Sequence, residues 1–352
     1  MKMSSKKYSI RNKWYLLFYL YRIIFASILF FKLIPGLEPA DALNFNAGVN
    51  SAYTSYSGGI STRIILFLNI WFNVIFGKYI SFLVFTSITS YVLVKLCENI
   101  NYSKRYILLT IFSLPTFTMF SVGLTKEFFI IAFISLFVIY IINKKYKLIF
   151  LLLFLLILFV KPQIALIVIF YFIFTSLKKL KNNLLDIRLP VIFLSLIIFF
   201  FLVFIFSDQL FIYQKLISSH FSDSSNTTRN IVFFEDKYSY VTKSLEGIYY
   251  LVFGPTIFEV INLKQGLVIF LENSYIILLL ILKTKRTNYL ILSKSKIYIY
   301  FSLFFVGFYV LYPAAIYNFV SAIRYRIPIL ILIIYYFFHL NKTHEKKSPT
   351  IH

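Results

Sequence analysis

The feature that most constrains this chain is a series of long apolar runs separated by short clusters of lysine and arginine. The run at 14–34 contains only two charged residues, Arg22 and Lys32. A helix needs about 20 such residues to cross the hydrocarbon core of a bilayer. Hydrophobic residues make up 60% of the chain and charged residues only 14%, which excludes an ordinary soluble domain. The sequence therefore predicts an all-α, polytopic integral membrane protein.

Ten of the apolar runs are predicted to cross the membrane. Their basic clusters give the orientation, because cytoplasmic loops carry an excess of Lys and Arg. Alternating the sides places 23 Lys and Arg residues in cytoplasmic segments or at the cytoplasmic ends of crossings and 11 outside, with both termini cytoplasmic. The predicted crossings are 14–34, 79–96, 106–120, 128–143, 147–160, 164–177, 189–207, 266–282, 297–313 and 327–340.

The short apolar run at 64–77 is predicted to be an interfacial or re-entrant helix on the outer side. Counting it as a crossing would place the basic segment KLCENINYSKR outside the cell. The chain then forms one integral membrane domain, 14–340, between cytoplasmic tails 1–13 and 341–352, with a large outer loop at about 208–265. The first apolar run is too long for a signal peptide and lacks a cleavage site, so we expect a retained helix.

The net charge of +23 does not indicate a nucleic-acid partner, because the basic residues lie mainly in the short clusters between apolar runs. The single cysteine, Cys97, excludes an intramolecular disulfide framework and a thiolate metal site. The four histidines show no metal-ligand spacing. The expected partners at this stage are membrane lipids.

Charged residues mark the outer ends of several unusually short crossings. Five predicted crossings, namely 106–120, 128–143, 147–160, 164–177 and 327–340, have no more than 16 residues, so their outer ends should lie below the membrane surface. Those ends carry Lys126, Glu127, Lys161, Arg324 and Arg326. A charge facing lipid costs about 2.5–3.5 kcal/mol on insertion scales. We therefore expect these residues to line a polar cavity that opens to the outside.

The segment before the last crossing suits anion binding. Pro328 favours the first turn of a helix and disfavours a helical conformation for Ile327. Arg324 and Arg326 are therefore expected to precede the helix in an extended stretch, where residues two apart point the same way. With the two lysines of the other short ends, the cavity would offer up to four cations. This is a suitable receptor for a lipid-linked diphosphate.

Arg22 and Glu272 lie well inside predicted crossings. Arg22 lies eight residues into the first one, and its side chain is expected to snorkel to the inner face of the membrane. Glu272 lies in VIFLENSY and is expected to pair with another group within the helix bundle.

Several motifs occur in an order that resembles a known family. They are the acidic first outer loop EPADALNFN, the hairpin SLPTFTMFSVGLTKE, the break VKPQ, the outer-loop end YYLVFGPTIFEV and the late segment RYRIP. Over roughly 35–340 the chain resembles the bacterial polysaccharide polymerases of the Wzy type, which join O-antigen or capsule repeat units. At the basic-proline break these polymerases commonly carry arginine, whereas this chain has Lys161.

The resemblance implies a glycosyltransferase on the periplasmic side of the bacterial inner membrane. Its donor would be an oligosaccharide on undecaprenyl diphosphate, and a hydroxyl of a second lipid-linked repeat unit would attack the first sugar. The resemblance favours Asp41 as the catalytic base, with Glu127 as the reserve candidate. Gln163 and Arg229 are candidate glycan-binding residues. A chain-length regulator protein is a candidate partner.

No metal or other cofactor is expected. Fixed lysine and arginine side chains can stabilise a departing diphosphate without a divalent ion. The sequence also shows no paired carboxylates that would hold such an ion.

Two other functions remain open on the sequence. A flippase for lipid-linked oligosaccharides usually has two repeated halves and small outer loops, neither of which occurs here. A different glycosyltransferase or ligase that uses the same lipid carrier is hardly separated from a polymerase by the sequence.

Overall fold

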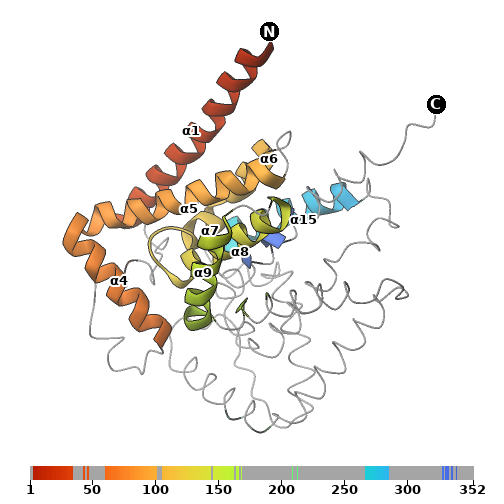
Figure 1. Cartoon of the computed structure of the whole chain (residues 1–352). Helices are drawn as coiled ribbons and strands as arrows, with labels where there is room; N and C mark the ends of the chain where they lie inside the picture. Colours follow the sequence, from red (N-terminus) through yellow and green to blue (C-terminus); the bar gives the residue numbers. More distant parts are fainter. Residues whose placement is uncertain are drawn as a thin grey trace, which may run out of the picture. The chain divides into compact units, whose positions relative to one another are not determined.

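The computed structural model describes residues 3–34, 43, 46, 60–100, 105–143, 146–161, 164, 165, 168, 208, 212, 266–284, 327, 328, 330–332, 334, 335 and 338. Every regular element in these segments is a helix, which confirms the all-α prediction for this part of the chain (Figure 1). The chain divides into two compact units, 1–162 with 330–352 and 163–329. Each unit is described by itself.

Three helices of the first unit are long and apolar enough to cross a bilayer. They are α1 (Met3–Phe30), in which the apolar stretch is 13–30, α5 (Lys78–Ile100) and α8 (Lys126–Asn143). All three coincide with predicted crossings. The shorter α9 (Lys147–Val160) matches the predicted crossing 147–160, and α15 (Gly266–Thr284) of the second unit includes the predicted crossing 266–282. These helices are compatible with a membrane protein.

The total of ten crossings stays a prediction. The runs 189–207 and 297–313, most of 164–177, part of 327–340 and nearly all of the outer loop 208–265 lie outside the described residues.

One predicted crossing, 106–120, is wrong as a single helix. The structure instead has α6 (Arg105–Phe112) and α7 (Pro115–Phe120). Pro115 has no N–H to continue the helical ladder, and the Ile111 carbonyl accepts from Leu114 N–H at 3.3 Å instead. Pro115 then occupies the first turn of α7, where its missing N–H costs no hydrogen bond.

Two helix boundaries also differ from the sequence prediction. The first crossing ends at Phe30 instead of residue 34, because Lys32 adopts a left-handed conformation with φ of 53° and Leu33 N–H donates to Ile28 O at 3.0 Å. Helix α8 begins two residues earlier than predicted. Its start is capped by Thr125, whose hydroxyl oxygen accepts from Phe128 N–H at 3.3 Å.

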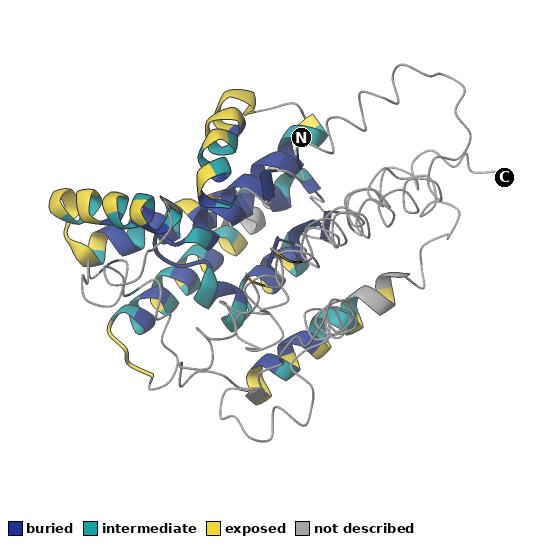
Figure 2. Cartoon of the chain, turned by 90° about the horizontal axis from the view of Figure 1, so that it is seen from below, coloured by how far each residue is buried: buried dark blue, intermediate teal, exposed yellow. Residues whose placement is uncertain are grey.

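Helix α5 lies at the centre of the first unit and packs against α1, α4 (Ile60–Phe76), α6 and α8. Helix α4 confirms a helix at the run 64–77, and Gly77, with φ of 77°, turns the chain from α4 into α5. Burial differs strongly between the membrane-length helices, since 72% of α8 is buried but only 22% of the apolar stretch of α1. Figure 2 shows the buried residues where helices meet and the exposed ones along outer sides.

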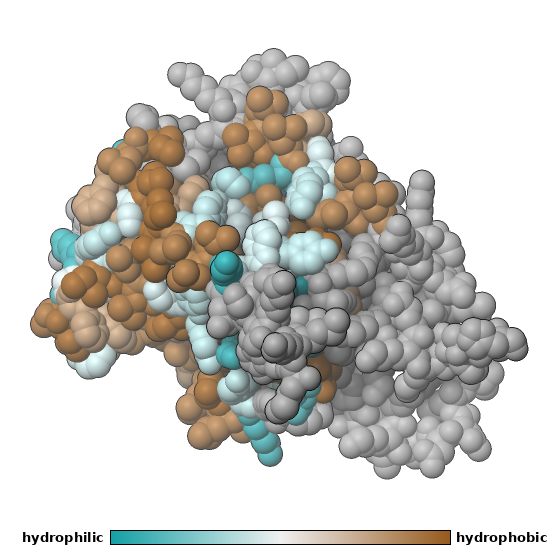
Figure 3. Space-filling model, turned by 90° about the horizontal axis from the view of Figure 1, so that it is seen from above, coloured by the Kyte–Doolittle hydropathy of each residue, from teal (hydrophilic) through white to brown (hydrophobic). Residues whose placement is uncertain are grey.

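Apolar side chains also cover the outer surface. Phe67 and Val74 of α4 and Leu148 of α9 are each more than two-thirds exposed. Broad apolar areas are visible on the described surface in Figure 3. In water such a surface would drive aggregation, whereas in a bilayer it contacts lipid.

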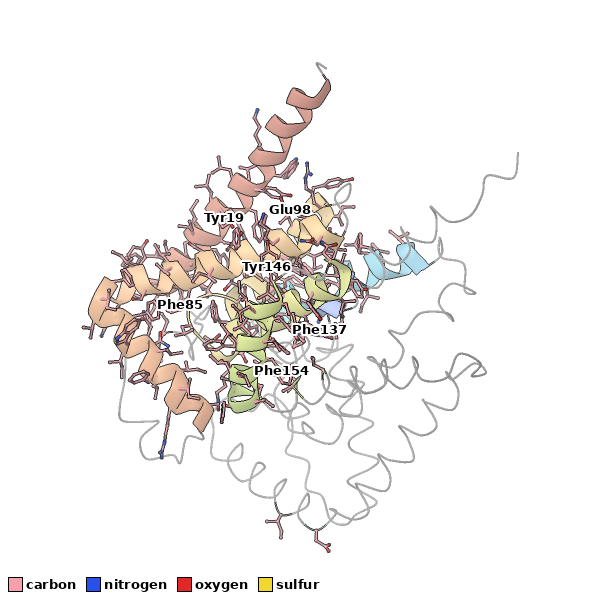
Figure 4. All side chains as sticks on the ribbon, viewed as in Figure 1. Tyr19, Phe85, Glu98, Phe137, Tyr146 and Phe154 are labelled. Atoms are coloured by element: carbon pink, nitrogen blue, oxygen red, sulfur yellow. The ribbon has the colours of Figure 1, made fainter. Side chains whose placement is uncertain are left out.

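Helices α8 and α9 form an antiparallel pair held by aromatic rings. Tyr140 stacks on Phe150 with ring centroids 5.3 Å apart, and Phe133 lies 6.1 Å from Phe154. Residues later in α9 therefore contact residues earlier in α8, as in an antiparallel pair. Figure 4 labels Phe137 on α8 and Phe154 on α9. The beginning of α8 and the end of α9 consequently lie at the same end of the pair.

Candidate functional site

The loop that joins α7 to α8, residues 121–125, is buried throughout. Its sequence, SVGLT, does not form a helix, so its backbone polar groups need partners other than the helical ladder. Irregular backbone at membrane depth is tolerated only where protein or a polar cavity surrounds it. The loop leads directly into Lys126 and Glu127, two of the predicted site residues.

Side chains from α1 and α5 bind the first half of this loop. Arg22 of α1 donates through Nη2 to the Ser121 carbonyl at 3.1 Å and to the Ser121 hydroxyl at 2.8 Å. Gly123 N–H donates to the hydroxyl oxygen of Thr86 in α5 at 3.2 Å. Thr86 in turn donates its own hydroxyl proton to Phe82 O at 2.9 Å. Its hydroxyl is thereby oriented to accept from the loop.

A side chain from α4 binds the second half. Asn69 is 2% exposed and donates through Nδ2 to the Leu124 carbonyl at 3.1 Å and to Ile65 O at 3.0 Å. Side chains from three helices, α1, α4 and α5, therefore replace the hydrogen bonds that water would otherwise give to residues 121, 123 and 124.

Gly123 is required by both conformation and space. Its φ of 65° lies in the left-handed region, which favours glycine. A Cβ atom built on Gly123 would lie 2.6 Å from the ring of Phe82, a side chain that is itself 1% exposed. Phe82 packs with Ala26, Leu29 and Val122 in the core beside the loop.

The prediction that Arg22 snorkels to the membrane surface is wrong. The side chain is fully buried, and besides Ser121 it bonds Ser90 of α5 through Nε at 2.8 Å. It also makes a longer contact from Nη1 to Phe112 O at 3.4 Å. Oxygen acceptors on neighbouring segments hold the guanidinium inside the unit, so it has no need to reach water.

Lys126 and Glu127 form the first turn of α8. Lys126 is partly buried, whereas Glu127 is only 4% exposed. A carboxylate at this position is stabilised by the N–H groups and the dipole of the helix N-terminus. The turn thus places a lysine and a glutamate next to each other in the sequence, directly after the buried loop.

Lys161 follows the last residue of α9 and is also partly buried. Its backbone N–H caps the helix by donating to Ile157 O at 2.8 Å. Because α8 and α9 are antiparallel, Lys161 lies at the same end of the pair as Lys126 and Glu127. Three of the predicted site residues are therefore at one end of one helix pair.

The other predicted site residues lie outside the described part of the chain. These are Asp41, Gln163, Arg229, Arg324 and Arg326. The prediction that Ile327 is extended is wrong, because Ile327 and Pro328 are both helical and buried. A proline ring disfavours a helical conformation for the preceding residue but does not forbid it, so Ile327 can be helical. In α15, Glu272 is buried, and its predicted pairing within the bundle stays a prediction.

Sequence reasoning missed the polar residues that hold the loop. Thr86 and Ser90 are four residues apart in α5, as are Asn69 and Asn73 in α4. Such spacing puts two polar side chains on one face of an otherwise apolar helix, and this signal could have indicated a buried polar contact. Within the described segments, no three His, Cys, Asp or Glu side chains gather as a metal site would require.

Comparison of the chain with protein-family models, curated proteins and solved structures gave no match.

Proposed function

We propose that this chain is an integral membrane glycosyltransferase that joins oligosaccharide repeat units carried on undecaprenyl diphosphate. One observation carries the proposal: Lys126, Glu127 and Lys161 lie at one end of the α8–α9 pair, beside a buried loop. An apolar bundle retains such charges mainly where they serve a substrate or ion. A lipid-linked diphosphate is an anion that reaches this depth.

The length of α9 supports a site below the membrane surface. Its 14 residues span about 21 Å at about 1.5 Å each, which is less than the roughly 30 Å of the hydrocarbon core. If Lys147 lies at the cytoplasmic boundary, Lys161 lies several ångströms below the outer one. This depth suits the diphosphate of a substrate whose lipid tail remains in the bilayer.

The proposed reaction has a simple balance. A hydroxyl oxygen of the acceptor sugar attacks the anomeric carbon of the donor chain, and the bond from that carbon to the diphosphate oxygen breaks. The hydroxyl proton goes to a carboxylate, for which Asp41 and Glu127 are the candidates. The negative charge that develops on the leaving diphosphate is stabilised by Lys126, Lys161 and the two arginines before the last predicted crossing.

The same proposal includes the topology and the location of the protein. They are ten crossings, cytoplasmic termini, a location in the bacterial inner membrane and a site that faces the periplasm. No metal or other cofactor is needed, since the lysine and arginine side chains provide the positive charge. A chain-length regulator is the candidate protein partner.

Deletion of the gene tests the proposal in a strain whose lipopolysaccharide carries the polymer. Each repeat unit should still be flipped and ligated, so the deletion strain should show lipid A core with a single repeat unit on a silver-stained gel. The polymer ladder should return with the wild-type gene and with Lys147→Ala, a matched lysine at the other end of α9. It should be lost or greatly shortened with Lys126→Ala, with Lys161→Ala and with the double variant Arg324→Ala, Arg326→Ala.

The remaining outcomes distinguish the alternatives. Bare core in the deletion strain contradicts the polymerase and favours a flippase. An unchanged ladder in that strain indicates a different transferase. Full-length polymer from Lys161→Ala at normal membrane levels removes this lysine from the proposed diphosphate site.

A further inference from the structure

Arg22 is a buried cation whose hydrogen-bond partners in the described part of the chain are all neutral. It is 0% exposed, and its guanidinium donates to two serine hydroxyls and to the backbone carbonyls of Phe112 and Ser121. The ring of Phe18 lies 5.7 Å from its central carbon. An apolar side chain of similar size would avoid the cost of burying a charge, so stability alone gives a poor reason for an arginine here.

The arrangement of acceptors explains why the residue is an arginine. Nε binds Ser90 of α5, whereas Nη2 binds both the carbonyl and the hydroxyl of Ser121 in the loop. These segments are 68 and 99 residues away from Arg22 in the sequence. A guanidinium presents its donors in a fixed planar fork, so one side chain sets the spacing between α5 and the loop. A lysine ammonium has no such fixed spacing.

The serine hydroxyls are oriented to receive the arginine. Ser90 donates its proton to Thr86 O at 2.7 Å, and Ser121 donates its proton to Thr118 O at 3.1 Å. Each hydroxyl proton is thereby committed, and each oxygen presents its lone pairs to Arg22. The two serines are therefore oriented as acceptors for the guanidinium before any other contact is considered.

The network leads to the candidate site. Ser121 begins the buried loop that ends at Thr125, the cap of α8, and the next two residues are Lys126 and Glu127. The other two side chains that hold the loop, Thr86 and Asn69, each make one neutral hydrogen bond to it. Arg22 makes two charge-assisted bonds, which are the stronger kind.

We propose that Arg22 is a positioning residue, which fixes the α7–α8 loop and thereby sets where Lys126 and Glu127 stand relative to the bundle. The catalytic part of this inference rests on the proposed function, but the positional part does not. The two parts can therefore be tested separately.

The positional test measures the reaction rate of a cysteine placed at the site. In a Cys97→Ala background, Lys126→Cys is treated with a small methanethiosulfonate reagent in the full chain. Arg22→Gln should raise the labelling rate about tenfold, because the loop loses its hydrogen bonds to the guanidinium and opens locally. The matched variant Arg63→Gln changes an exposed arginine on α4 and should leave the rate unchanged. Labelling of Lys147→Cys should not respond to Arg22→Gln.

Two further variants keep the test decisive if Arg22→Gln does not accumulate. Arg22→Lys keeps the charge but not the fork, and Ser121→Ala removes one acceptor; both should give intermediate labelling rates. Unchanged labelling at position 126 in all the Arg22 and Ser121 variants that reach the membrane overturns the proposal.

The catalytic test keeps Lys126 in place and measures kcat and KM of the purified protein with lipid-linked repeat units. Arg22→Lys should lower kcat by about 100-fold with KM little changed, since misplacing catalytic groups by about 1 Å has that effect. A merely structural role would lower the amount of folded enzyme and leave the kcat of the folded fraction intact. That result overturns the positioning of the catalytic groups. Failure of the wild-type chain to make polymer contradicts the proposed function instead, and the labelling rates then decide on Arg22 alone.

Discussion

The two ends of α8 differ in how their connecting backbone is satisfied. At the beginning of the helix, residues 121–125 are buried and held by side chains of α1, α4 and α5. At the other end, Asn143, Tyr146 and Lys147 are exposed. The exposed end can rely on water or lipid headgroups for its polar groups, whereas the buried end cannot.

In the part of the chain that the structure describes, buried polar side chains hold the connecting backbone only at the beginning of α8, where water does not reach it. A buried hydrogen-bond donor or acceptor without a partner costs about 1–3 kcal/mol, so a buried loop persists only when all its polar groups are matched. The end of α8 that bears Lys126 and Glu127 has the more constrained backbone. Constrained backbone beside charged residues is what a preorganised site requires.

The largest effect is expected from a methyl group at the buried end. Gly123→Ala should lower the free energy of unfolding by about 1–2 kcal/mol, because alanine is strained in the left-handed conformation. Displacing Phe82 should lower it by about 1–3 kcal/mol more. Gly77→Ala provides the matched control, because Gly77 also has a positive φ but nothing lies within 4 Å of its added Cβ. Thermal melting of detergent-solubilised protein should show a much larger loss for Gly123→Ala. Equal losses would contradict the crowding at the loop.

A smaller effect is expected from removal of one hydrogen bond between uncharged groups. Asn69→Leu keeps the side-chain size but leaves the buried Leu124 carbonyl without this donor, which should cost about 1–3 kcal/mol. The matched change at the exposed end is Asn143→Leu, which removes a hydrogen bond to Asn99. Because solvent can replace that partner, its cost should stay below about 0.5 kcal/mol. A larger loss for Asn143→Leu in the same melting experiment would reverse the comparison.

The smallest effect is expected at Tyr146, where the exposed end contains its own strained residue. Tyr146 precedes α9 with φ of 61°, a conformation that a bulky side chain rarely adopts. Asparagine tolerates it better, so Tyr146→Asn should stabilise the protein by no more than about 1 kcal/mol. The melting temperature should rise slightly and polymer formation should stay unchanged. A fall in melting temperature would show that the tyrosine ring has a packing role.

Much of the helical pattern could be predicted from hydropathy. The segment 147–160 is helical over the predicted residues, and α5 and α8 extend their predicted runs by a few residues each. Errors arose where a local hydrogen-bonding rule overrides hydropathy. Pro115 divides an apolar run that hydropathy alone joins, and Thr125 starts α8 before its apolar residues begin.

The charged candidate residues could be chosen from the sequence, whereas the side chains that hold the neighbouring loop could not. Lys126, Glu127 and Lys161 were visible as charges beside short apolar runs, because their cost in a membrane depends only on local sequence. The role of Arg22 was not visible. In a chain read by itself, an arginine eight residues into a crossing is within reach of the membrane surface, so snorkelling is the natural expectation.

By itself, the sequence determined that the chain forms apolar helices and that a few charges interrupt them, because hydropathy and charge are local properties. Only the tertiary structure decided what those charges touch. Arg22 finds its acceptors 68, 90 and 99 residues away, and the loop at 121–125 takes its partners from α1, α4 and α5. The physical reason is that a buried polar group must be satisfied by whichever groups packing brings within hydrogen-bond distance, and packing depends on all the helices together.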